Sequence, residues 1–108
     1  MQYLKNSFTV YGLALGIFSL TSTVALSSPR FIIDFNTDRI GLDYRNFNTN
    51  SMESCLRACA TENQCRAFTY VPPFAQPGTP NAEGICWLKD RVPEASNNPG
   101  GMISGIKQ

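Results

Sequence analysis

Four cysteines constrain this chain more than any other feature of its sequence. Cys55, Cys59 and Cys65 lie within the stretch 50–71, and Cys86 lies in a later apolar run. Four cysteines allow three different pairs of disulfides. A chain of 108 residues is one domain at most, and a domain of this size buries a modest core that often needs such cross-links.

The first two cysteines lie on a predicted amphipathic helix. Apolar residues recur there at the spacing i, i+3, i+4, i+7 and i+8, which places them on one helix face. They are Met52, Cys55, Leu56, Cys59 and Ala60.

The sequence also contains signals for both ends of this helix. Asn50 is a suitable N-cap, and Glu53, three residues later, can bond back to it as in a capping box. Asn63 is a suitable left-handed residue at the C-terminal end.

Short strands are expected on both sides of the helix. The segments with strand composition are 31–35, 41–47, 65–71, 85–89 and 102–106. Asn36-Thr37-Asp38 is expected to form a turn after the first of them. Several short strands around one helix predict an α+β fold with an antiparallel sheet.

Two irregular segments separate the later strands. Residues 72–84, PPFAQPGTPNAEG, are rich in turn formers and form a long connection for so small a domain. Connections of this length are usually either functional or loosely ordered. Residues 90–101 form a second loop, which ends in a flexible run at 96–101.

Helix geometry favours one pairing of the cysteines. Cys55 and Cys59 lie one turn apart with side chains that leave the helix in parallel, so a bond between them would distort it. Cys65 follows the helix closely and can fold back on Cys59, which leaves Cys55 to bond Cys86. A zinc site is disfavoured, because the spacings C-x3-C and C-x5-C differ from the paired C-x2-C pattern of thiolate zinc sites.

The N-terminus predicts a secretory signal peptide over residues 1–27. An apolar stretch at 8–20 follows Lys5, and the small residues Ala25 and Ser27 come next, as signal cleavage requires. Cleavage there would leave a secreted, extracytoplasmic domain at 28–108. The alternative is an uncleaved membrane anchor, which would make the chain an envelope-associated structural or interaction protein.

Charge and residue content exclude several function classes. Acidic and basic residues balance after residue 28, so we expect neither nucleic acid nor an anionic membrane surface as a partner. The chain has no histidine and no phosphate-binding glycine motif, and we expect no cofactor.

Acidic residues offer little support for catalysis or metal binding. Asp38 with Asp43, or Glu83 with Asp90, are the remaining carboxylate pairs, but each lies in a turn-like or loop segment, so we expect no enzyme. The run 34–38 matches the start of a calcium loop, D-x-N-x-D. The match then fails, because arginine stands where that loop needs its glycine and its final glutamate.

Together these motifs resemble a known family. The segments DRIGLDYRNF, C-x3-C-x5-C-R-A-F-T-Y, C-W-L-K and I-S-G-I-K are similar to the small four-cysteine type of PAN/Apple module, over about residues 38–107. The resemblance implies one central helix on a curved antiparallel β-sheet, with disulfides Cys55–Cys86 and Cys59–Cys65. It also implies a non-catalytic module that binds proteins or carbohydrates.

The sequence therefore predicts a secreted binding module for a protein or carbohydrate ligand. The candidate contact residues, chosen because the fold has no evident need to bury them, are Arg66, Tyr70, Phe74, Gln76 and Asn81. Each has a structural alternative: Phe74 could cover the edge of the core, and Arg66 and Tyr70 could belong to the outer face of the sheet. Trp87 is expected to serve in packing and not as a platform for a sugar.

Overall fold

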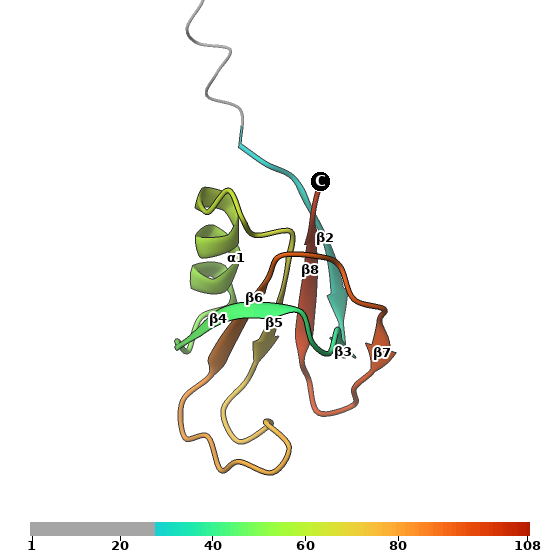
Figure 1. Cartoon of the computed structure of the whole chain (residues 1–108). Helices are drawn as coiled ribbons and strands as arrows, with labels where there is room; N and C mark the ends of the chain where they lie inside the picture. The colour runs from blue at the N-terminus through green and yellow to red at the C-terminus, as the bar shows by residue number, and fades with distance from the viewer. Residues whose placement is uncertain (1–27) are drawn as a thin grey trace, which may run out of the picture.

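The structure is a computed structural model that describes residues 28–108 (Figure 1). The expected signal peptide, 1–27, lies outside these residues. The elements in chain order are β2 (Phe31–Phe35), β3 (Thr37–Asp38), β4 (Asp43–Asn48), α1 (Met52–Thr61), β5 (Ala67–Val71), β6 (Ile85–Lys89), β7 (Ser96–Asn97) and β8 (Ile103–Lys107). Within this part of the chain, no helix is both long and apolar enough to cross a membrane.

Five strands form one antiparallel sheet in the order β2-β8-β5-β6-β4. The helix α1 lies against one face of this sheet, where it contacts β5, β6 and β8 (Figure 1). The predicted fold class, one helix on an antiparallel sheet, is confirmed. β5 is buried along its whole length because it lies in the middle of the sheet between β6 and β8.

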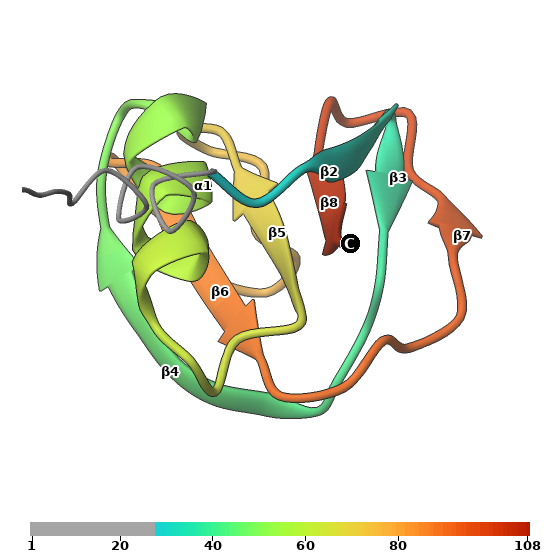
Figure 2. The same ribbon diagram turned by 90° about the horizontal axis from the view of Figure 1, so that it is seen from above.

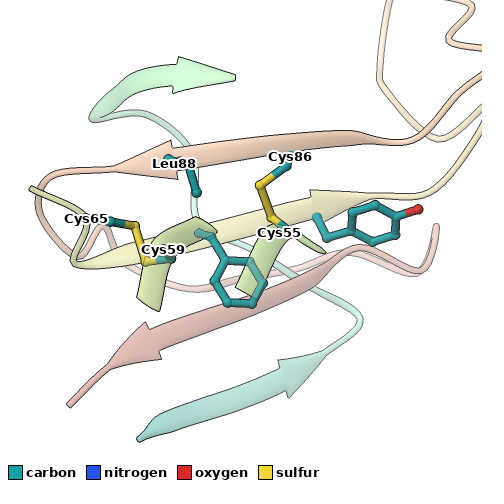
Figure 3. Close-up of a cluster of buried hydrophobic side chains, with 7 residues drawn as sticks. Cys55, Cys59, Cys65, Cys86 and Leu88 are labelled. Carbon is teal, nitrogen blue, oxygen red and sulfur yellow. A yellow bond between two sulfur atoms is a disulfide. The ribbon is translucent and has the colours of Figure 1, made fainter. Parts of the chain in front are cut away.

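Both predicted disulfides are present, and they join the helix to the rest of the core (Figure 3). Cys55 bonds Cys86 on β6, and Cys59 bonds Cys65 just before β5. All four cysteines are fully buried. Phe68, Tyr70 and Leu88 pack with them, so the sulfur atoms form part of the hydrophobic core and also cross-link it.

The helix ends differ from the predicted ones. Ser51, not Asn50, is the N-cap, and its hydroxyl accepts a hydrogen bond from the Ser54 amide at 3.2 Å. The Asn50 side chain instead accepts a hydrogen bond from the Gly84 amide at 2.7 Å, which ties the helix start to the end of the long loop. Glu62 is the C-cap in an extended conformation, so the expected left-handed ending at Asn63 was also wrong.

The second face of the sheet has a cover that the sequence analysis missed. The expected turn at 36–38 is a single left-handed residue, Asn36, followed by β3, and β3 pairs with β7 inside the run predicted to be flexible. Figure 2 shows this two-stranded ribbon and its connections on the side of the sheet away from α1. Two hydrogen bonds attach the ribbon to β8 and to the residue before it. The Thr37 amide donates to the Met102 carbonyl at 3.0 Å, and the Thr37 carbonyl accepts from the Ser104 hydroxyl at 2.8 Å.

Candidate functional site

The long loop, residues 72–84, is held in place by one buried side chain. Asn81 is 7% exposed, and its Oδ1 accepts a hydrogen bond from the Gln76 amide at 3.0 Å. Its Nδ2 donates to the carbonyls of Pro72 and Glu83 at 3.0 and 2.9 Å. Because these bonds satisfy an otherwise costly buried amide, they fix the loop in one conformation.

Phe74 projects from this fixed loop into solvent. Its side chain is 76% exposed, and its backbone is left-handed with φ of 65°. A bulky residue seldom adopts this conformation, which is found where the surroundings enforce it, often at functional sites. The enforcing contact here is the hydrogen bond from the Phe74 amide to the Asn81 carbonyl at 2.6 Å. Phe74 therefore does not cover the edge of the core.

A cavity of about 180 Å³ lies on the face of the sheet away from α1. Side chains alternate along a strand, so Cys86 and Leu88 of β6 point to the helix while Trp87 and Lys89 point to this cavity. Gln76 reaches it from the long loop. The lining residues are Asp38, Ile40, Gly41, Asp43, Val71, Gln76, Trp87, Lys89 and Met102.

Hydrogen bonds position the polar groups of the cavity. Lys89 is 2% exposed, and its Nζ donates to Asp43 Oδ1 at 2.5 Å and to the Gly41 carbonyl at 3.1 Å. The Trp87 indole donates to Gln76 Oε1 at 3.1 Å. A buried ammonium without partners would be costly. The bonds from Lys89 to Asp43 and Gly41 therefore explain how this lysine can lie inside the domain.

The ribbon side of the cavity supplies a further carboxylate. Asp38 Oδ1 accepts a hydrogen bond from the Arg39 amide at 2.7 Å. The cavity therefore combines two carboxylates, one ammonium, one amide and an aromatic ring. No group of three or more potential metal ligands occurs among residues 28–108.

The five predicted contact residues fall into three places. Phe74, Gln76 and Asn81 lie together on the loop, although Asn81 is buried beneath it. Tyr70 is 6% exposed and packs in the core, where burial raises the pKa of its phenol. Arg66 is exposed just before β5, and its Nη1 donates to the carbonyls of Asn63 and Cys65. The structure thus brings three of the five together and separates the other two from them.

Sequence reasoning missed the cavity, although part of its signal was present. Cys86 was predicted to bond the helix, so strand alternation would place Trp87 and Lys89 on the opposite face. Asp38 and Asp43 had been considered as a carboxylate pair, and both line the cavity. Asp38 and Asp43 reach the same cavity only because the β3–β7 ribbon folds over the sheet, and no local sequence pattern indicated this ribbon.

Comparison with known proteins agrees with this architecture. Residues 37–89 match the family described as PAN domain, a span that runs from the start of β3 to the end of β6. This segment belongs to the PAN domain family. The PAN segment includes both disulfides and the whole long loop, whereas the edge strand β2 and its neighbour β8 lie outside it.

A curated protein also resembles the chain. Uncharacterized protein L719 of Acanthamoeba polyphaga mimivirus is 30% identical over 70 residues, which cover 65% of this chain. The chain spans 18% of the length of that protein. No solved structure matches the chain.

Proposed function

We propose that this protein is a secreted interaction module that binds a protein or carbohydrate ligand through the surface around its long loop. PAN domains are generally binding modules without enzymatic activity. The observation that carries the proposal is Phe74, an aromatic side chain held in solvent on a fixed loop. Exposed, rigidly held aromatic residues are typical anchors of interfaces, because they bury a large area at little cost in conformational entropy.

The five predicted residues have different roles in this proposal. Phe74 and Gln76 make direct contacts, and Asn81 acts indirectly by holding the loop. Tyr70 supports the end of the loop, since a Cβ added at Gly84 would collide with the Tyr70 hydroxyl. Arg66 would extend the contact surface only for a ligand large enough to reach the far end of β5.

Two disulfides support an extracytoplasmic location, because such bonds persist in oxidising compartments. We propose that residues 1–27 are the signal peptide that directs export and that the mature chain is the domain 28–108. N-terminal sequencing of the mature protein should then give a start near Leu26 or Ser28. Retention of Met1 would instead favour the membrane-anchored alternative.

Capture of a ligand by matched variants tests the binding function. The immobilised protein is exposed to the proteins exported by its source and, separately, to a glycan array. Phe74→Ser removes the proposed anchor, while Phe35→Ser removes an equally large side chain, 66% exposed, from the edge strand β2. A central aromatic anchor contributes about 2 kcal/mol or more, so Phe74→Ser should weaken capture about thirtyfold.

The control decides how this result is interpreted. Phe35→Ser should capture the same ligand as the unaltered protein. Equal losses in both variants would contradict a contact surface at the loop. Absence of any captured protein or glycan would contradict the binding function itself.

A further inference from the structure

We propose that the cavity on the outer face of the sheet is a subsite for one neutral, hydroxyl-bearing ring of monosaccharide size. The proposal rests on the binding function given above and assigns a ligand class to the cavity beside the loop. Four observations carry it: the volume of the cavity, its mixed walls, its charge balance and the fixed positions of its polar groups.

The volume suits a single sugar ring. At about 180 Å³, the cavity is smaller than sites for drug-sized ligands, which are roughly 300–1,000 Å³. One water molecule occupies on the order of 15 Å³ of cavity volume, so the cavity has room for about a dozen water-sized groups. A pyranose with its hydroxyls has a similar number of non-hydrogen atoms. A longer ligand would have to continue out of the cavity.

The walls match both faces of such a ring. Ile40 and Trp87, the latter predicted from the sequence to serve in packing alone, provide apolar surface above the buried side chains of Val71 and Met102. C–H groups of a sugar can pack against this surface. Asp38 and Asp43 provide carboxylate oxygens, each of which accepts more than one hydrogen bond. The amide nitrogen of Gln76 is a donor, whereas the buried ammonium of Lys89 already donates to Asp43 and Gly41. Hydroxyl groups are suited to this mixture because each can donate and accept.

The charges disfavour an ionic ligand. Two carboxylates and one ammonium leave one net negative charge on the lining, which opposes an anion. The ammonium of Lys89 already occupies the position between Asp43 and the Gly41 carbonyl, so a cation would have to displace it from these partners. A neutral ligand avoids both penalties and does not have to give up the strong hydration of an ion.

The polar groups are positioned before a ligand arrives. The hydrogen bond between Trp87 and Gln76 and the ion pair between Lys89 and Asp43 fix four lining side chains on three different parts of the fold. Groups held in this way lose little conformational freedom on binding, which favours affinity. The same two contacts connect the cavity to the long loop and to the start of β4.

Tryptophan fluorescence provides a direct test, because Trp87 is the only tryptophan in the chain. The full protein is titrated with the methyl pyranosides of glucose, galactose, mannose and N-acetylglucosamine. Glucuronate and methylammonium serve as the anionic and cationic probes. A ligand of about a dozen non-hydrogen atoms binds weakly, so we expect a Kd on the order of 1 mM for the best neutral sugar.

Two variants locate the effect. Asp38→Asn keeps the oxygen that accepts the Arg39 amide but removes the charge, and it should weaken binding about tenfold. Glu94→Gln removes an exposed charge outside the lining and should leave the Kd unchanged. Far-ultraviolet circular dichroism confirms that both variants are folded.

Three results would overturn the proposal. They are no saturation by any pyranoside up to on the order of 100 mM, equal binding by Asp38→Asn and the unaltered protein, and tighter binding of either ionic probe. If capture that depends on Phe74 persists while the sugars fail, the cavity assignment is wrong and the binding function stands. If both fail, the binding function itself is wrong.

Discussion

Phe68 fills the centre of the core because the residue opposite it on β8 has no side chain. Gly105 pairs directly with Phe68, and a Cβ added there would overlap three atoms of the phenyl ring. Phe31 packs against the same ring at a centroid distance of 5.9 Å. The glycine is therefore required for space, since its backbone conformation is not left-handed.

We predict that Gly105→Ala destabilises the domain by about 1–3 kcal/mol, the usual cost of an overpacked core. Chemical denaturation of the two proteins measures this difference. In a Phe68→Leu background the same substitution should cost clearly less, because the ring edge that it meets is absent. An equal cost in both backgrounds would show that the collision with Phe68 is not the cause.

Glu62 connects the end of the helix to β4. Its Oε1 accepts hydrogen bonds from the Tyr44 hydroxyl at 2.8 Å and from Arg45 Nε at 3.1 Å. These bonds lower the pKa of Glu62 below its ordinary value of 4.5, and the bond from Arg45 has the largest effect. Burial, together with the bond to Glu62, raises the pKa of Tyr44 to about 12.

The lowered pKa of Glu62 predicts a loss of stability in acid. A carboxyl group with a lowered pKa in the folded state stabilises the fold above its unfolded pKa, and this contribution is lost as the pH falls through the folded value. The free energy of unfolding should therefore fall more between about pH 5 and pH 3 in the unaltered protein than in Glu62→Gln. Parallel curves for the two proteins would contradict this role of Glu62.

At the scale of elements, one disulfide attaches the helix to β6 and the other attaches it to the segment just before β5. Cys55–Cys86 closes a loop with a sequence separation of 31, while Cys59–Cys65 closes one of 6. In the chain-entropy model, a disulfide that closes a longer loop restricts the unfolded chain more. The model gives a stabilisation of about 3.7 kcal/mol for Cys55–Cys86 and about 2.2 kcal/mol for Cys59–Cys65.

We predict that the Cys55→Ala/Cys86→Ala variant loses more stability than Cys59→Ala/Cys65→Ala, by about 1.5 kcal/mol. Each variant removes one bond and leaves no free thiol. Thermal unfolding of both against the unaltered protein measures the order. The reverse order would mean that strain or packing outweighs loop entropy in this domain.

The elements also show what could be predicted from the sequence. The helix follows from strong local periodicity, the strands at 31–35 and 85–89 follow from their residue composition, and the cysteine pairing follows from helix geometry. The N-cap was misplaced by one residue because Asn50 bonds Gly84, a partner 34 residues away. The β3–β7 ribbon was missed because each strand has two residues, too few for any periodic pattern.

At the scale of the whole molecule, the sheet separates two environments. The face toward α1 holds the disulfides and the aromatic core, and its contacts maintain the fold. The opposite face holds the polar cavity, with the ribbon on one side and Gln76 of the long loop on the other. Strand alternation indicates only the β6 wall of the cavity, because its other walls come from segments that only the tertiary fold brings together.

The separation of the two sheet faces predicts which backbone amides change their environment when a ligand binds. Backbone amide shifts of the nitrogen-15-labelled protein, recorded with and without the captured ligand, report the contact surface residue by residue. The largest changes should lie at residues 72–84, with Phe74 and Gln76 foremost, while the exposed face of α1, including Arg57, should be unchanged. Changes concentrated on α1 and absent from the loop would contradict the account.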